Sequence, residues 1–275
     1  MFAGAAFLVL RYSPFRGAKS RALFIVLALL LPAFAGTAPG SSYFNLRIID
    51  AAAGSCVLLQ TTLFTAFLSG PVILAGRFWV RPQIRPLDAW ILFRGLVKLL
   101  LFLPAVMHFE SGLLLPLQMN SEGLANAGRT ALFLYARLFL DFSGYSDCVT
   151  GVSGLMGIRV RNNFCRPYLA ASLRAFWLRW HATLGDALRK HLYPVLPRAL
   201  GASMVLVLVG AWHGISLHYL IWGLMHGAGL MVEKRFLYPL GRRLKNRFGP
   251  LCARIYGTTL TQTFVGLTWI VFFWK

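Results

Sequence analysis

Long apolar runs separated by short basic loops dominate this chain, and they restrict what it can fold into. Hydrophobic residues make up 57% of the 275 positions and charged residues only 13%, with a mean hydropathy of +0.64. A membrane-spanning helix needs about 20 mostly apolar residues, and its backbone must satisfy its hydrogen bonds within the helix. The pattern therefore predicts an all-α polytopic membrane protein.

The apolar runs predict about six to eight transmembrane or re-entrant helices, with amphipathic helices at the cytoplasmic surface. The run 199–232 would be about 51 Å long as one helix, against a hydrocarbon core of about 30 Å, so we expect a break near Gly214 to Ser216. No internal repeat or linker divides the sequence, so one membrane domain over 1–275 is the simplest organisation. The other helices are expected at 23–34, 51–76 (interrupted by Gly70-Pro71), 87–106 (amphipathic, ended by Pro104), 124–142 and 257–274.

Positive charge is concentrated in the loops. The chain has 28 Lys and Arg against 8 Asp and Glu, a formal net charge of +20, and most cations lie in 13–21, 77–85, 159–198 and 234–254. Basic loops at span ends mark the cytoplasmic side of a membrane and favour anionic headgroups or an anionic cytosolic ligand. We expect no nucleic-acid partner, because no recognition motif accompanies the charge.

The stretch from Asp141 to His213 collects polar residues that bulk packing does not explain. Asp141 and Asp147 lie six residues apart, about 600° around a helix, and so on different faces. Carboxylates at a span end must be paired or solvated, and we expect them to pair with arginines between 159 and 179. This structural role is favoured over catalysis.

Three histidines in apolar surroundings are the candidate reactive groups. His213 is predicted to lie about 20 Å into the bilayer, and an ionisable residue at that depth is a functional candidate; the alternative is a helix-to-helix hydrogen bond. His226 lies on the next segment and can approach His213, but no carboxylate or cysteine at ligand spacing supports a metal, so we expect none.

His181 falls within 169–192, which we interpret as one amphipathic helix at the cytoplasmic surface. Its ring follows the apolar stripe, so a buried hydrogen-bonding role is the simpler interpretation and catalysis the alternative. The stripe consists of Leu173, Phe176, Trp177, Trp180, Leu184 and Leu188.

The order and spacing of five segments resemble the membrane-bound O-acyltransferase (MBOAT) family, in its bacterial polysaccharide or alginate O-acetylase-like branch. With an upstream Phe67-Leu-Ser-Gly-Pro71 the resemblance runs over about 64–235, and the N-terminus is short compared with that family. The segments are Asp141-Phe-Ser-Gly-Tyr-Ser-Asp147, Asn163-Phe-Cys-Arg-Pro-Tyr168, Phe176-Trp-Leu-Arg-Trp-His181, Gly210-Ala-Trp-His-Gly214 and Trp222-Gly-Leu-Met-His-Gly227.

The resemblance implies an enzyme that moves an acyl group, acetyl in this branch, from a cytosolic thioester such as acetyl-CoA to a hydroxyl of an exported polysaccharide or a lipid. It makes His213 the catalytic histidine and His181 the second signature histidine, and it implies no bound cofactor. A periplasmic or membrane-anchored acyltransferase partner is also expected, together with membrane lipids. Substrate contacts are expected from Trp212, Asn163, Arg166, Arg179 and Trp180, and structural motif roles from Asp141, Ser143, Gly144, Tyr145, Asp147 and His226.

Three alternatives remain open at this point. Within the enzyme class, the chain could transfer D-alanyl or a lipid acyl group. Outside it, His213 and His226 could relay protons in a transporter, or the chain could be an inactive relative that serves as an assembly partner.

Overall fold

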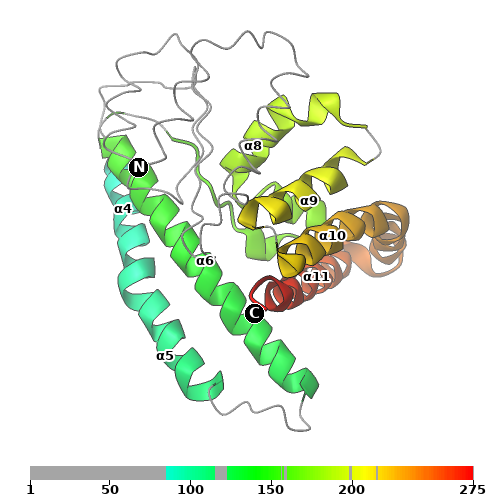
Figure 1. The fold of residues 1–275 in the computed structure, drawn as a ribbon, viewed down its shortest axis with the longest axis horizontal. Helices are drawn as coiled ribbons and strands as arrows, with labels where there is room; N and C mark the ends of the chain where they lie inside the picture. The colour runs from blue at the N-terminus through cyan, green and yellow to red at the C-terminus, as the bar shows by residue number, and fades with distance from the viewer. Residues whose placement is uncertain are drawn as a thin grey trace.

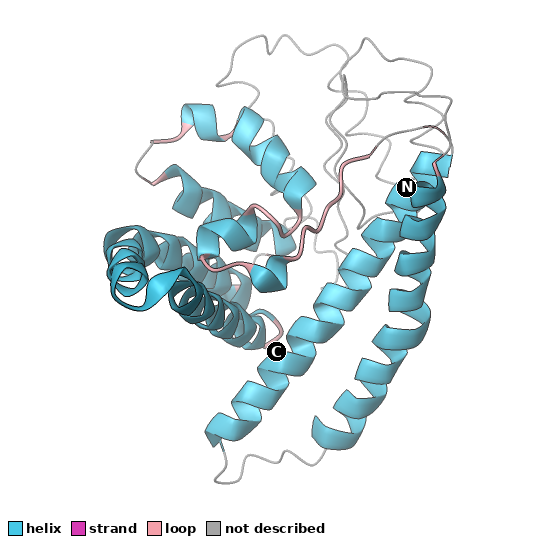
Figure 2. Cartoon of the chain, turned by 180° about the vertical axis from the view of Figure 1, so that it is seen from behind, coloured by secondary structure: helices cyan, strands magenta, loops and turns pink. Residues whose placement is uncertain are grey.

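The computed structural model of the protein describes residues 85–114, 123–155, 157, 160–197, 200–214 and 216–274, and every regular element within them is helical (Figures 1 and 2). The all-α prediction is confirmed for this part of the chain. The spans expected at 23–34 and 51–76, with Gly70-Pro71 and the upstream motif 67–83, lie outside the described residues.

One helical stretch in the described part, Pro86–Phe109, is long and apolar enough to cross a membrane, and Gly201–His213 is a shorter apolar helix. The predicted number of spans stays a prediction.

The first helical stretch runs through three segments: α4 (Pro86–Val97), the π-helical turn η2 (Lys98–Phe102) and α5 (Leu103–Leu114). The prediction that Pro104 ends this helix is wrong. Proline clashes with the carbonyl four residues earlier in a regular α-helix, and here the wider π turn lies directly before it.

Helix α6 (Gly123–Leu155) runs back antiparallel beside α4 and α5 (Figure 1). The helix expected at 124–142 therefore continues to Leu155, and the motif 141–147 lies inside a helix rather than at its end. The two helices approach closely at small residues: a Cβ added at Gly151 would lie 2.5 Å from the backbone nitrogen of Leu92.

The second group of helices follows a short 3₁₀ turn, η3 (Pro167–Leu169). It contains α7 (Leu173–Trp177), α8 (Ala182–His191), the 3₁₀ turn η4 (Tyr193–Val195), α9 (Gly201–His213), α10 (Leu217–Val232), the π turn η5 (Glu233–Leu237) and α11 (Tyr238–Phe272). The expected break in 199–232 is confirmed, because α9 ends at His213 and α10 begins at Leu217. The span expected at 257–274 is the second half of α11, which kinks at Gly249 (φ 86°).

The single helix predicted over 169–192 is wrong. Two short helices replace it, and His181 adopts a left-handed conformation (φ 46°, ψ 49°) between them as the N-cap of α8. The apolar stripe itself was correctly identified for five of its six members: Leu173, Phe176, Trp180, Leu184 and Leu188 are buried. They form the main core together with residues of α9, α10 and α11.

Candidate functional site

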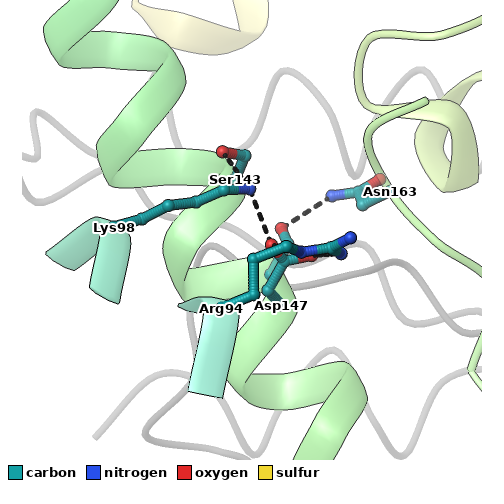
Figure 3. A network of polar contacts seen from close by, with 6 residues as sticks. Arg94, Lys98, Ser143, Asp147 and Asn163 are labelled. Carbon is teal, nitrogen blue, oxygen red and sulfur yellow. Dashed lines mark hydrogen bonds and ion pairs between the residues drawn. The ribbon is translucent and has the colours of Figure 1, made fainter. Parts of the chain in front are cut away.

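A buried carboxylate joins the first two long helices (Figure 3). Asp147 on α6 accepts hydrogen bonds from Arg94 Nε and Nη2 at 2.9 and 2.6 Å and from Lys98 Nζ at 2.6 Å. Lys98 also donates to Ser143 Oγ at 3.0 Å. The prediction that Asp147 pairs with arginines between 159 and 179 is wrong, because its partners come from α4 and η2.

The partners were available in the sequence. Arg94 and Lys98 are four residues apart and therefore lie on one face of their helix, opposite the small residues of α6. Asp147 is 7% exposed, whereas Asp141 is exposed on another face, as the spacing predicts. A buried carboxylate held by two cations from another helix ties the two helices together, which is the structural role favoured for this motif.

The rest of the 141–147 motif also packs between helices. Ser143 and Gly144 are buried, and a Cβ added at Gly144 would lie 2.9 Å from the Leu99 side chain. Tyr145 is half-buried.

Asn163 forms the centre of a second polar network, and its side chain is almost fully buried. Its Oδ1 accepts from Thr183 N at 3.3 Å and from Thr183 Oγ1 at 2.8 Å, and lies 3.0 Å from His181 Nδ1. Its Nδ2 donates to Ser146 Oγ at 3.1 Å. Figure 3 shows Asn163 reaching toward α6 from the loop that precedes α7.

This network determines the protonation of the His181 ring. A backbone N–H can only donate, so the Asn163 atom facing Thr183 N must be the oxygen. Because that same oxygen faces His181 Nδ1, the Nδ1 atom carries the proton in the neutral ring. The lone pair of the imidazole is therefore on Nε2.

The His181 turn is tied to the loop carrying Asn163 by two backbone hydrogen bonds: Ala182 N donates to the Asn163 carbonyl at 2.8 Å, and Cys165 N to the Arg179 carbonyl at 3.0 Å. The His181 ring lies edge-on to Phe142 at 4.8 Å between centroids. Burial, and secondarily the nearby His213, lowers the pKa of His181 to about 3, so its ring is neutral at pH 7.

His213 is the last residue of α9 and lies in an aromatic cage. Its ring centroid is 4.7 Å from Trp212, 4.8 Å from Phe272, 5.9 Å from Tyr219 and 6.0 Å from Trp222. The ring makes no hydrogen bond to any described residue, and it is half-buried. A helix-to-helix hydrogen bond, the structural alternative for this histidine, is therefore not found in the described part.

His226, unlike His213, has a hydrogen-bond partner in the described part of the chain. It is fully buried, with its Nε2 2.9 Å from Thr268 Oγ1, and Thr268 donates its own proton to the Val265 carbonyl at 2.8 Å. The Thr268 oxygen must accept from His226, so Nε2–H is the protonated nitrogen and the ring joins α10 to α11. Trp222 contacts both this ring, at 4.7 Å, and that of His213.

The remaining candidates are distributed around this centre. Trp180 is buried, stacks on Phe176 at 5.5 Å and contacts Trp269 at 5.6 Å. Trp212 is buried, Arg179 is half-buried, and Arg166 is exposed with φ 51° before η3. The structure thus brings Asn163, Trp180 and His181 into contact with one another or with shared neighbours, whereas Arg166 lies at the surface. Within the described ranges no three His, Cys, Asp or Glu side chains gather as a metal site.

Sequence reasoning missed two residues that position the site. Thr183 joins the Asn163 network, and Glu233 on η5 is buried and accepts the backbone N–H groups of Leu173 and Arg174 at the start of α7. A lone acid in a long basic stretch was the available signal for Glu233. Thr183 gave none.

The model of the membrane-bound O-acyltransferase family matches residues 86–245, which confirms the resemblance seen in the motifs. Among curated proteins, the chain is 36% identical to the probable alginate O-acetylase AlgI of Pseudomonas syringae pv. tomato, over 52% of this chain and 27% of that protein. It is 27% identical to the peptidoglycan O-acetyltransferase of Helicobacter pylori, over 85% of this chain and 46% of that protein. It is 32% identical to the teichoic acid D-alanyltransferase of Streptococcus thermophilus, over 47% of this chain and 36% of that protein. The chain therefore spans between about a quarter and a half of the length of these relatives.

Proposed function

The chain belongs to the membrane-bound O-acyltransferase family, and we propose that it is an acyltransferase of the bacterial inner membrane. In this proposal it moves an acetyl group from a cytosolic thioester, such as acetyl-CoA, to a hydroxyl of an exported or cell-envelope polysaccharide. The alginate and peptidoglycan O-acetylating relatives support the acetyl group and the glycan acceptor. A multi-pass topology and a periplasmic or membrane-anchored partner are parts of the same proposal.

One observation supports the assignment of the site: the matched segment holds two histidines whose surroundings differ. His181 has its Nδ1 fixed by Asn163, whereas the His213 ring lies among aromatic side chains and makes no hydrogen bond to any residue that the structure describes. A ring with an uncommitted nitrogen is suited to take and return a proton.

In the proposed reaction, His213 takes the proton of the acceptor hydroxyl as its oxygen attacks the thioester carbonyl. A carbon–oxygen bond forms, and the tetrahedral oxyanion accepts a hydrogen bond from an N–H group such as the Trp212 indole. The carbon–sulfur bond then breaks, and the thiolate takes the proton from the His213 imidazolium. The thioester's thiol and the acetylated acceptor leave.

His181 would position the donor or relay protons through its Nε2 lone pair. Trp180 would contact substrate beside it, and Arg166 and Arg179 would attract an anionic donor such as coenzyme A. Asn163 is expected from the motif to contact substrate. Its side chain is instead within hydrogen-bond distance of His181, Thr183 and Ser146. In this proposal Asn163 acts by positioning His181.

The experiment is acyl transfer from labelled acetyl-CoA by the purified chain in liposomes, with alginate or peptidoglycan fragments as acceptors. His213→Ala should lose about a hundredfold or more in rate, the usual contribution of a general base. His108→Ala, which removes an exposed histidine on α5, is the matched control and should keep the wild-type rate. Equal rates in folded His213→Ala and wild type would remove His213 from the mechanism.

The D-alanyltransferase relative favours one second candidate, D-alanyl transfer to a cell-wall polymer. The same assay with a D-alanyl thioester on a carrier protein separates the two. Faster transfer from that donor than from acetyl-CoA would replace acetyl transfer by D-alanyl transfer.

A further inference from the structure

The outer end of the α10–α11 pair carries a segment that the catalytic site does not use (orange in Figure 1). We define the basic segment as residues 234–255, from η5 through the first half of α11 and its kink at Gly249. We propose that this segment binds the anionic phospholipid headgroups of a bilayer surface and lies in the interface plane.

Its charge is entirely of one sign. Six exposed cations lie within fourteen residues, with no acid between them: Lys234, Arg235, Arg242, Arg243, Lys245 and Arg247. The nearest acid, Glu233, is 5% exposed and holds the backbone N–H groups that begin α7. Its single negative charge offsets one of the six positive charges, so the segment keeps a large positive excess and attracts anions.

The cations alternate with apolar side chains that no described residue covers. Phe236 is 62% exposed, Phe248 58% and Leu251 70%, and Leu240 and Ile255 are also exposed. Leu240 and Phe248 precede the kink at Gly249, and Leu251 and Ile255, four residues apart, follow it on one face of the second half of α11. The Arg235 and Arg247 guanidinium groups lie over the neighbouring Phe236 and Phe248 rings, at 5.9 and 5.4 Å.

The combination of exposed cations and exposed apolar side chains indicates which kind of ligand the basic segment binds. A soluble phosphate-bearing molecule or a nucleic acid would neutralise the cations but leave the exposed apolar side chains in water. A bilayer interface accepts both, because apolar side chains enter the acyl boundary while Lys and Arg remain among the phosphates. The preference for anionic over zwitterionic lipid comes from the cations, since each one near an anionic surface adds several-fold to binding.

The test is native mass spectrometry of the full chain in detergent, titrated with phosphatidylglycerol and with phosphatidylcholine of the same acyl chains. The variant R242Q/R243Q/K245Q/R247Q removes four cations of the segment. The variant R129Q/R137Q/R174Q/K190Q removes four exposed cations from α6, α7 and α8 and has the same net charge. Unchanged melting curves of both variants show that folding is intact.

We expect wild type and the second variant to bind phosphatidylglycerol at least about tenfold more tightly than phosphatidylcholine, and the first variant to lose that preference. Equal losses in the two variants would reduce the effect to net charge and overturn the proposal. No preference in wild type would also overturn it.

A second variant tests whether the exposed apolar side chains contribute to lipid binding. Phe248→Ser with Leu251→Ser keeps every cation and should weaken binding of both lipids. If this variant binds both lipids as wild type does, or if a single-stranded RNA 20-mer displaces the lipid at equal concentration, the segment binds polyanions and not a bilayer surface.

Discussion

Replacing Asn163 by alanine tests the assignment of the His181 tautomer most directly. The change leaves Thr183 N–H and His181 Nδ1–H without their acceptor, while the Thr183 hydroxyl can rotate to another partner. Each unsatisfied buried donor costs about 1–3 kcal/mol, so we expect the free energy of unfolding to fall by about 3 kcal/mol.

The loss of the acceptor also releases the ring. Without Asn163 Oδ1, His181 can place its proton on either nitrogen, and the lone pair is no longer restricted to Nε2. We expect the rate of acyl transfer to fall at least about tenfold beyond what the loss of folded protein explains.

Asn163→Asp is the matched control, because a carboxylate keeps the acceptor oxygen that faces Thr183 and His181. It should keep the Nδ1–H tautomer and raise the pKa of His181 above its wild-type value of about 3, since an opposite charge favours the protonated ring.

The measurements are denaturant titration in micelles and ¹⁵N chemical shifts of His181, which distinguish a protonated ring nitrogen from an unprotonated one. A proton on Nε2 in the wild-type protein would refute the reasoning. So would an Asn163→Ala protein with unchanged stability and an unchanged His181 spectrum.

Three further predictions concern the stability of the folded protein. Asp147→Asn should destabilise the protein by about 2–3 kcal/mol, because its two cations lose their carboxylate, whereas the exposed Asp141→Asn should change stability little; denaturant titration compares them. Gly223→Ala would set a Cβ 2.7 Å from a backbone oxygen of α9 and should cost about 1–3 kcal/mol, whereas Gly241→Ala meets nothing within 4 Å and should melt at or above the wild-type temperature. Between about pH 3 and 6.5 the unfolded chain binds a proton at His181 that the folded chain does not, so folded stability should rise with pH across this window; a His181→Gln variant should show a flatter melting temperature against pH.

The features that the sequence predicted correctly depend on helix length and helical geometry within one short stretch of chain. The break between α9 and α10 follows from the length of one apolar run against the thickness of a membrane. The separation of Asp141 from Asp147 onto different faces follows from helical geometry alone. Motif order was enough to predict the family, because several segments had to match together.

The features that sequence did not predict depend on contacts between distant residues. Asp147 pairs with cations 49 and 53 residues earlier, although arginines closer in the sequence were available. The left-handed turn at His181 gave no signal, since the apolar spacing from Leu173 to Leu188 suits one continuous helix. Histidine is enriched among non-glycine residues with positive φ, but such residues are so uncommon that one histidine in an apolar stripe does not predict a left-handed turn.

The cost of that turn explains why its surroundings are so constrained. A non-glycine residue in the left-handed region costs about 1–3 kcal/mol and persists only where neighbouring contacts determine the backbone. Here Asn163 binds Ala182 and Thr183 just after His181, and Glu233 binds the first backbone N–H groups of α7 before it. Both ends of the 173–183 segment are therefore fixed by buried polar groups. A regular helix through residue 181 would continue in the direction of α7 and would lose the Asn163 contacts, so the strained turn and the oriented imidazole are maintained by the same hydrogen bonds.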